Sequence, residues 1–485
     1  MSIAARQGGR RMNAFDHAIA PVLPVLLAVG AFACLAGIWR AAATIPLHVP
    51  LDPNEGWNAY HAAAAMAGHG LYPDPRSFML NNYPPLSFYL VGLLGNMTGD
   101  QIIAGRLVSL ASFVCICILA ILAARRLGAS LQGALLSAIV LAATFFLTSD
   151  YVGMDDPQLL GNALQLGGLL FLLREKRPAP AVFAAAFLFV AGGFVKHNLF
   201  VLPLAAAAWL ASFDRRSALR LVIAGSCLCL AGLVAFRLLS GVDLLARLAS
   251  ARLWFLEQFA SSLAAWFPFA VVPLVGMAAY RFSRPNDLPA AFVSLYAALG
   301  IAIGAFMGGG AGVDVNAMFD ADIALALGAG LVMSRLLEER RPAPHLLGRA
   351  FAFAAFVPFM VLAAQTDEWR DSGFWLHPLR EETSLAAQDI EFLRSRPGPA
   401  ICESLAFCYW AGKPDPVDDF NLDQQFRTGR RDMVPFLELL GAHHFTAIEL
   451  DETDPFPLPN IVRSAILYNY RIDHTNDEGT FLVPR

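Results

Sequence analysis

Carboxylates in two short segments have the type and spacing for acid–base chemistry. Asp52 and Glu55 stand three residues apart, so one helical turn would place both on the same face. A carboxylate beside apolar walls gains basicity through desolvation and can act as a general base. Two structural interpretations stay open: Asp52 could cap a helix that begins near Glu55, and Glu55 could be a first-turn carboxylate stabilised by the helix dipole. His61 adds a further polar group nearby.

The second acidic segment, residues 149–157, carries Asp150, Asp155 and Asp156. Three carboxylates so close together repel one another unless a positive group lies among them. That group could be a divalent cation such as Mg²⁺ or Mn²⁺, an arginine, or a cationic group of a substrate. Asp156 precedes Pro157, which is also good chemistry for the start of a helix. A capping role and a ligand role are compatible, and Asp155 and Asp156 are the metal candidates.

Two further polar residues stand in unusual surroundings. Lys196 is one of only three lysines in the chain, and it interrupts an apolar run. Its ammonium needs a partner there, and a phosphate is one candidate, although the side chain could also reach solvent. Asn316 lies in a glycine-rich, acidic segment, residues 308–322. Those glycines could let the backbone approach a ligand closely, or could only form a loose turn.

The elements that must position these residues are predicted to be membrane helices. The chain of 485 residues is 57% hydrophobic and 15% charged, with a mean hydropathy of +0.53. A soluble globular chain has about 25% charged and about 45–50% apolar residues, and a disordered chain is more polar still. A net charge of −4 and a pI near 6.2 give no sign of a nucleic-acid partner. The composition therefore predicts a multi-pass membrane protein.

About eleven apolar runs are candidates for spanning helices, each near the length of about 20 residues that a membrane requires. They are residues 18–39, 106–124, 132–149, 158–173, 179–195, 198–213, 218–239, 263–280, 288–307, 319–337 and 346–364. The first is not a cleaved signal, because no small-residue cleavage site follows it. We expect residues 1–365 to form a transmembrane domain with a long first outer loop, residues 40–105.

Basic residues beside the runs predict the orientation. With a cytoplasmic N-terminus, the inner loops carry sixteen Lys and Arg residues, including Arg6, Arg10 and Arg11, and the outer loops carry seven. This asymmetry favours that orientation in the plasma membrane, which for a bacterium is the inner membrane. Asp52, Asp156 and the other loop carboxylates then fall at the outer membrane boundary. Ionisable groups at the edge of a bundle are functional candidates, so the outer face is predicted to be the working face.

Residues 366–485 are more polar and predict a small soluble α/β domain outside the membrane. The pattern favours a strand at 400–409, a helix at 433–440, a strand at 445–450, a helix at 461–467 and a hairpin that turns at 476–479. Cys402 and Cys408 could form a disulfide outside the cytoplasm, but six residues along one extended segment is poor geometry for a bridge.

Roughly residues 15–340 resemble membrane glycosyltransferases of the GT-C fold. The group includes dolichyl-phosphate-mannose protein mannosyltransferases and lipid A aminoarabinose transferases. The resemblance depends on the order of several motifs: Asp52-Pro-Asn-Glu55-Gly-Trp, Leu71-Tyr-Pro, Asn82-Tyr-Pro-Pro-Leu, Gly105-Arg-Leu-Val-Ser109, Asp156-Pro157, Lys196 in a short hairpin and the Gly/Asn/acidic segment that holds Asn316. It implies an all-α multi-pass bundle of GT-C type, which the small C-terminal α/β domain predicted from the pattern of residues 366–485 follows.

The resemblance also implies an activity. Such enzymes move a sugar, with inversion, from a polyprenyl-phosphate carrier to a glycan, lipid or protein acceptor on the extracytoplasmic side. A first-loop carboxylate would be the base, and because Asn54 replaces the acidic residue common in the family, that base is Asp52 or Glu55. Lys196 or Arg106 would stabilise the leaving phosphate. Tyr83 stands where some relatives carry a lysine, and the remaining substrate-binding candidates are His61, Asp155, Asp156 and Asn316.

Two other classes of function compete with a transferase. A transporter or flippase of lipid-linked sugars usually has internal repeats and key charges near the bilayer midplane, whereas these charges lie at one boundary and no repeat is visible. A non-catalytic partner in envelope polysaccharide assembly is the second alternative, and Asn54 in the acidic motif is its main support.

Overall fold

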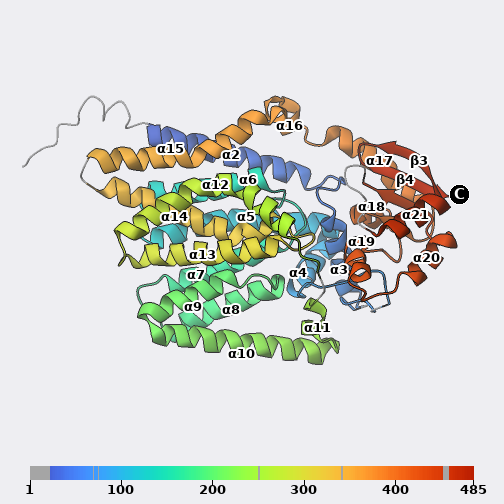
Figure 1. Ribbon diagram of the computed structural model, residues 1–485, viewed down its shortest axis with the longest axis horizontal. Helices are drawn as coiled ribbons and strands as arrows, with labels where there is room; N and C mark the ends of the chain where they lie inside the picture. Colours follow the sequence, from blue (N-terminus) through green and yellow to red (C-terminus); the bar gives the residue numbers. More distant parts are fainter. Residues whose placement is uncertain (1–21, 69, 75, 250–251, 340–341, 452–457) are drawn as a thin grey trace, which may run out of the picture.

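The computed structural model describes residues 22–485 except 69, 75, 250–251, 340–341 and 452–457. Arg6, Arg10 and Arg11, and the first residues of the predicted span 18–39, lie outside the described residues. Within them, helices form a bundle along the long axis of the molecule, and a small sheet with short helices lies at one end (Figure 1). The predicted fold class is confirmed.

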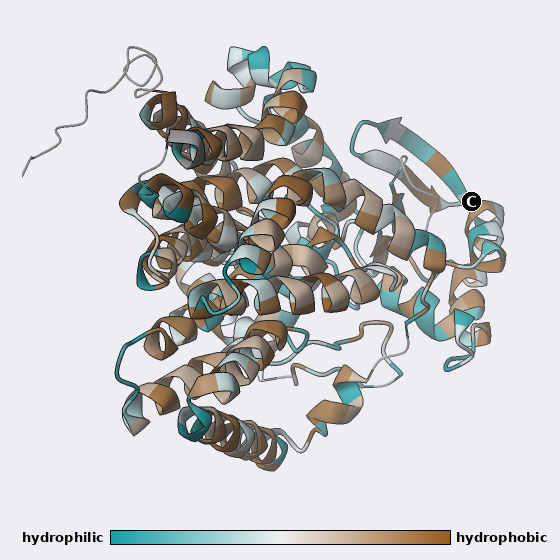
Figure 2. Cartoon of the chain, turned by 60° about the vertical axis from the view of Figure 1, so that its left-hand side comes forward, coloured by the Kyte–Doolittle hydropathy of each residue, from teal (hydrophilic) through white to brown (hydrophobic). Residues whose placement is uncertain are grey.

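Eleven helices of the described chain coincide with the eleven predicted spans. Eight are long and apolar enough to cross a membrane, whereas α7, α8 and α9 are apolar but shorter, so the count of eleven stays a prediction. Apolar residues cover these helices, and hydrophilic residues gather in the loops and the C-terminal part (Figure 2). The bundle helices are α2 (Val22–Thr44), α5 (Gln101–Arg126), α6 (Leu131–Thr148), α7 (Gln158–Leu172), α8 (Ala179–Val195), α9 (Val201–Phe213), α10 (Arg215–Ser240), α12 (Leu256–Ser283), α13 (Leu288–Gly308), α14 (Phe319–Glu338) and α15 (Pro342–Gln365).

Helix α14 is the centre of the bundle. In the most apolar stretch of α14, 94% of the residues are buried, compared with 6% in the corresponding stretch of α10. Small residues let its neighbours approach closely: a Cβ on Gly133 of α6 would lie 2.4 Å from the Gly330 carbonyl oxygen, and one on Gly300 of α13 would lie 2.7 Å from the Ala321 nitrogen. Close packing of small residues is typical of membrane helices, because lipid gives them little hydrophobic drive to associate.

Five connections meet at one end of the bundle, which we call the loop end (Figure 1). They are the first loop (45–100), the second loop (149–157), the Lys196 turn (196–200), the fourth loop (241–255) and the fifth loop (309–318). The first loop contains α3 (Asn54–Ala67) and α4 (Leu86–Thr98), the fourth contains α11 (Leu244–Leu248), and the fifth contains the 3₁₀ helix η1 (Val315–Met318). Asp100 then caps α5 by accepting from the Ile102 and Ile103 amides.

The chain after α15 forms the C-terminal unit, residues 367–485. Its sheet has the order β1-β2-β4-β3, with β1 parallel to β2 and the other pairs antiparallel. A core of apolar side chains from the strands and helices, Phe436, Phe445 and Ile466 among them, holds it together. Its elements are η2 (Asp367–Arg370), α16 (Ser372–Leu376), α17 (Arg380–Arg394), β1 (Ala400–Cys402), α18 (Leu405–Trp410), α19 (Asp419–Arg427), α20 (Val434–Gly441), β2 (Ala447–Leu450), α21 (Asn460–Asn469), β3 (Tyr470–Asn476) and β4 (Gly479–Pro484).

Most of the predicted elements of this unit are confirmed, but the strand at 400–409 is wrong. The strand ends at Cys402, and α18 begins at Leu405. Because the chain turns into a helix instead of running on extended, Cys408 comes back to Cys402 and the two form a disulfide. The sequence analysis judged the bridge geometry poor because it assumed one extended segment, and the turn removes that objection.

The C-terminal unit packs directly on the first loop. A Cβ on Gly56 of α3 would lie 2.1 Å from the Ala406 nitrogen of α18, so the two backbones are in contact and only glycine fits. The Tyr60 hydroxyl donates to the Lys413 carbonyl oxygen, and the Trp410 indole donates to Asp100. The unit and the loop end therefore form one packed body.

Candidate functional site

Glu55 and Arg106 form a buried ion pair between α3 and α5, which we call the Glu55–Arg106 clasp. Both side chains are fully buried. Arg106 Nε lies 2.7 Å from Glu55 Oε1, and Nη2 lies 2.6 Å from Oε2, the two-pronged geometry that favours arginine with a carboxylate. The remaining N–H groups donate to backbone carbonyl oxygens of the first loop and its entrance, those of Thr44, Ile45, Leu47 and Val49.

The hydrogen-bonding capacity of Arg106 in the clasp is fully used. All five N–H groups of Arg106 are occupied, so none is left for a phosphate. Glu55 also accepts from the Leu51 amide at 2.9 Å and the Asp155 amide at 3.0 Å. In this geometry neither the Glu55 nor the Arg106 side chain reaches solvent. Both groups hold the first and second loops against α5 in this structure, and the roles of Arg106 as a phosphate ligand and of Glu55 as the base stay predictions.

Asp52 has a different environment from Glu55. It is half-buried, and its Oδ1 accepts from the Asn54 amide and from the Asn54 side chain, both at 2.8 Å. Burial, aided by the negative charges of Asp156 and Glu55 and opposed by the hydrogen bonds from Asn54, raises the pKa of Asp52 to about 6. Among the described residues, Oδ2 accepts no hydrogen bond. Asn54 thus orients the carboxylate.

The second ion pair of the loop end joins Asp156 to Lys196. Lys196 Nζ lies 3.1 Å and 3.2 Å from the two Asp156 oxygens, and both residues are buried. The rings of Tyr83 and Tyr151 lie 5.2 Å and 5.9 Å from the ammonium, within the range of cation–π attraction. Burial alone would lower the pKa of Lys196, but Asp156 and Tyr83 outweigh burial and raise it. Lys196 does not extend to solvent, and it is charged.

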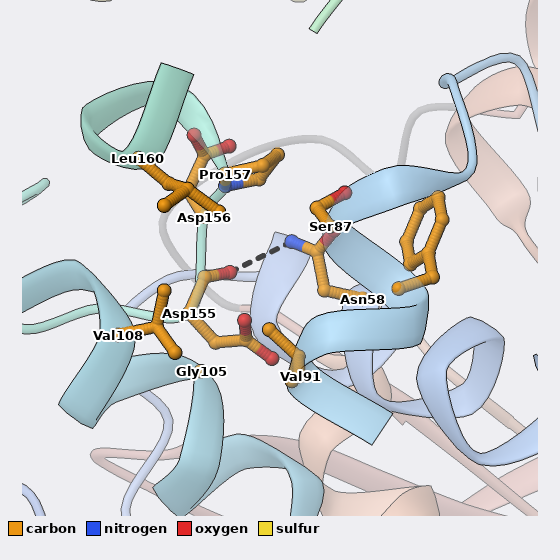
Figure 3. A pocket seen from close by; sticks show the side chains of 10 residues that line it. Asn58, Ser87, Val91, Gly105, Val108, Asp155, Asp156, Pro157 and Leu160 are labelled. Carbon is orange, nitrogen blue, oxygen red and sulfur yellow. Dashed lines mark hydrogen bonds between the residues drawn. The ribbon is translucent and has the colours of Figure 1, made fainter. Parts of the chain in front are cut away.

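Asp155 and Asp156 point in different directions (Figure 3). The Asp155 carboxylate turns toward Gly105 of α5, where an added Cβ would lie 1.8 Å from its Oδ1, and its carbonyl oxygen accepts from the Asn58 side chain at 2.7 Å. Burial, followed by the charges of Glu55 and Asp156, raises the pKa of Asp155 well above its ordinary value. Asp156 also accepts from the Gln158 amide at 2.6 Å, so it has the predicted capping contact as well as a charged partner.

The predicted metal site at Asp155 and Asp156 is not formed in this arrangement. Nowhere in the described part of the chain do three or more His, Cys, Asp or Glu side chains meet in a way that could hold a metal ion. A pocket of about 10 Å³ lies beside Asp155, Asn58 and Ser87 (Figure 3). Sites for small ligands are typically about 300–1,000 Å³, so this pocket does not take a sugar.

Two other predicted residues lie apart from these pairs. His61 is buried between Trp57 and Phe88, with Nε2 3.0 Å from the Leu80 carbonyl oxygen, and burial lowers its pKa to about 4. It is a neutral core residue of the first loop. Asn316 is buried in η1 of the fifth loop. Within the described residues, no hydrogen bond joins its side chain to Asp52, Asp156 or Lys196.

The structure adds Arg252 of the fourth loop, which the sequence analysis counted only as an outer basic residue. Its Nη1 donates to the Ala311 carbonyl oxygen at 2.8 Å. The described part of the chain offers its other four N–H groups no acceptor. Burial, together with the positive charges of Lys196 and Arg252 nearby, lowers the pKa of His197 to about 4. We call Asp52, Asp156, Lys196 and Arg252 the polar wall.

Asp418 of the C-terminal unit is a second residue near the site that the sequence analysis did not single out. It is buried, and its Oδ2 accepts from the Trp57 indole at 2.9 Å and from the Asn421 side chain at 2.8 Å. Burial raises its pKa to about 6. The residue lies 361 positions from Trp57 in the chain. No local sequence pattern connects the two, although the Asp-Asp pair at 418–419 resembles a helix start.

Comparison with known proteins identifies the fold. No family model matches the chain, and no curated protein matches it by sequence. Among solved structures, the chain is similar to ArnT from Cupriavidus metallidurans in the apo state, with a TM-score of 0.61 and 14% identity over 96% of this chain and 98% of that one. ArnT bound to undecaprenyl phosphate gives a TM-score of 0.59 at 14% identity over the same shares.

A second similarity extends to the archaea. The chain matches the oligosaccharyltransferase AglB from Archaeoglobus fulgidus, in complex with an inhibitory peptide and a dolichol-phosphate, with a TM-score of 0.52 and 13% identity over 88% of this chain and 69% of that one. At such identities the likeness establishes the fold. The chain therefore has the GT-C fold that the sequence motifs predicted.

Proposed function

We propose that the protein is a glycosyltransferase that moves a sugar, with inversion, from a polyprenyl-phosphate donor to an acceptor. One observation carries this proposal: a half-buried carboxylate, Asp52, lies at the same end of a GT-C bundle as two cations from distant loops, Lys196 and Arg252. ArnT, which shares the fold, was solved with undecaprenyl phosphate. A base and a phosphate-binding pair are the groups that transfer from a lipid phosphate requires.

Asp52 is the proposed general base. Its carboxylate takes the proton from an acceptor hydroxyl while that oxygen bonds to the anomeric carbon of the sugar. The bond from this carbon to the phosphate oxygen breaks, and its electron pair leaves with the polyprenyl phosphate. Burial supports the role, because a raised pKa makes the carboxylate a stronger base. Glu55 and Arg106 act as positioning residues that hold the first and second loops against α5.

Lys196 and Arg252 are the proposed partners of the leaving phosphate. Lys196 has three N–H groups, and its ammonium is held between Asp156 and the Tyr83 ring. Arg252 has N–H groups that no described residue occupies. Two cations aimed at one phosphate stabilise the charge that develops on it as the sugar leaves. Asp156 then positions Lys196 and does not bind a metal.

The loop end is proposed to face outward from the plasma membrane. The excess of basic residues in the other set of loops favours this orientation. The disulfide between Cys402 and Cys408 supports it as well, because such bonds persist in oxidising compartments. Alkaline phosphatase fused after Arg485 should be active and green fluorescent protein fused there dark. The opposite pattern would refute the orientation.

The transferase activity is tested with purified protein in nanodiscs. We expect it to bind undecaprenyl phosphate, and to release that lipid from a panel of undecaprenyl-phosphate hexoses and pentoses when a membrane extract supplies acceptors. Asp52→Asn should stop release but leave binding intact. Asp74→Asn, at an exposed carboxylate of the same loop, is the matched control. A wild-type protein that moves the intact lipid-linked sugar across vesicles without breaking it is a transporter, which would overturn the proposal.

A further inference from the structure

Helix α19 of the C-terminal unit, together with the residue before it, contacts the first, fourth and fifth loops. Asp418, directly before α19, accepts from the Trp57 indole of α3, and its amide donates to the Phe78 carbonyl oxygen of the first loop. Asp418 also caps α19 through the Asn421 amide at 3.0 Å. The start of α19 is thus tied to the helix that follows Asp52.

The same helix also holds the fourth loop. Gln424 is buried, and its Oε1 accepts from the Leu253 amide at 3.0 Å. The Phe420 ring lies 5.2 Å from the Arg252 guanidinium carbon, within cation–π range. Arg252 is therefore fixed by its neighbour's backbone, by an aromatic ring and by the Ala311 carbonyl oxygen, and the described residues leave most of its N–H groups unoccupied.

The fifth loop makes room for Phe420. A Cβ on Gly312 would lie 2.2 Å from the Phe420 ring, and Gly312 has a φ of +64°, a conformation that side chains rarely adopt. Trp254 of the fourth loop pairs with Gly310 as an isolated β-bridge, so the two loops are joined beside the ring. Phe420 therefore lies between Arg252 and Gly312, and a side chain at position 312 would displace the Phe420 ring.

We propose that α19 is a positioning element of the active site: Phe420 and Gln424 aim Arg252 at the donor phosphate, and Asp418 sets the first loop, with Asp52, opposite it. This inference rests on the proposed function and gives the C-terminal unit a direct part in donor binding. Phe420 acts through Arg252 and does not touch the reacting atoms, so it is a positioning residue and not a catalytic one.

Substitution of Phe420 tests the inference. Phe420→Leu keeps an apolar side chain but removes the aromatic face, and Phe420→Tyr keeps both. We expect Phe420→Leu to weaken undecaprenyl phosphate binding about three- to tenfold and to lower kcat/KM for the donor by at least the same factor, because Arg252 also stabilises the charge that develops on the leaving phosphate. Phe420→Tyr should bind like the wild type. Gly312→Ala should reproduce the Phe420→Leu result, because its Cβ displaces the ring.

A double-mutant cycle separates positioning from general structural damage. If Phe420 acts through Arg252, Phe420→Leu should have no further effect on binding in an Arg252→Ala background. Glu438→Ala, at an exposed residue of α20 in the same unit, is the matched control and should leave binding unchanged. Wild-type affinity in Phe420→Leu, equal losses in the Leu and Tyr variants, or additive losses in the double variant would each overturn the inference alone. A wild-type protein that fails to bind undecaprenyl phosphate would overturn the proposed function with it.

Discussion

Arg106 and Arg252 lie at the same end of the bundle, yet their surroundings differ in every respect that matters for ligand binding. Arg106 is fully buried, and all its N–H groups are used by Glu55 and four carbonyl oxygens. Arg252 is half-buried and uses one N–H group on Ala311. Burial and charge alone do not identify a binding residue. Within the described residues, the number of unoccupied N–H groups distinguishes Arg106 from Arg252.

The largest effect should follow from breaking the clasp. Arg106→Met leaves the buried Glu55 carboxylate without its charged partner and removes a donor from four carbonyl oxygens, so we expect the free energy of unfolding to fall by about 5 kcal/mol, the upper end of the range for buried pairs. Thermal unfolding in detergent measures this change. Arg125→Met, at the exposed end of the same helix, should shift the midpoint little. Equal midpoints in both variants would contradict the structural role of Arg106.

Asp52→Asn should affect activity and not folding. Loss of a general base lowers kcat by about 10²- to 10⁴-fold. Because Asp52 must be ionised and its pKa is raised to about 6, activity of the wild type should rise with pH through about 6 and level off above it. The stability contribution has the opposite trend: it is present below the ordinary pKa of 3.8 and lost as pH rises through 6. A pH–rate profile with no acidic limb near 6 argues against this base.

Arg252→Ala should weaken undecaprenyl phosphate binding about 10- to 100-fold, the size of one or two charged hydrogen bonds, without lowering the unfolding midpoint. Native mass spectrometry across a lipid titration gives the affinity. Arg237→Ala, at an exposed arginine on the neighbouring helix α10, provides the comparison. If Arg252→Ala unfolds like Arg106→Met while binding is retained, the two arginines do not differ as described.

The smallest effect concerns the aromatic face over Lys196. Tyr83→Leu removes the cation–π contact at an only partly exposed site, so we expect donor affinity to fall about threefold. Tyr83→Phe keeps the ring and should stay within twofold of the wild type. A loss of the same size in both variants would indicate that the hydroxyl, and not the ring, is what Lys196 requires.

The sequence predicted the helices and the convergence of the acidic segments, because long apolar runs and charged boundaries are local signals. It could not choose between Asp52 and Glu55. Three-residue spacing places both on one side of a helix, but the partner that occupies Glu55 is Arg106, 51 positions away. Arg252 and Asp418 gain their roles only through contacts between distant loops. The strand predicted at 400–409 was wrong because the turn after Cys402 carries no strong local signal.

The backbone contact at Gly56 limits how the chain can be divided. A shortened chain that ends at Gln365 would uncover the bare main chain of α3 and leave the Trp57 indole without Asp418. The helix that bears Glu55 would then lose its outer support.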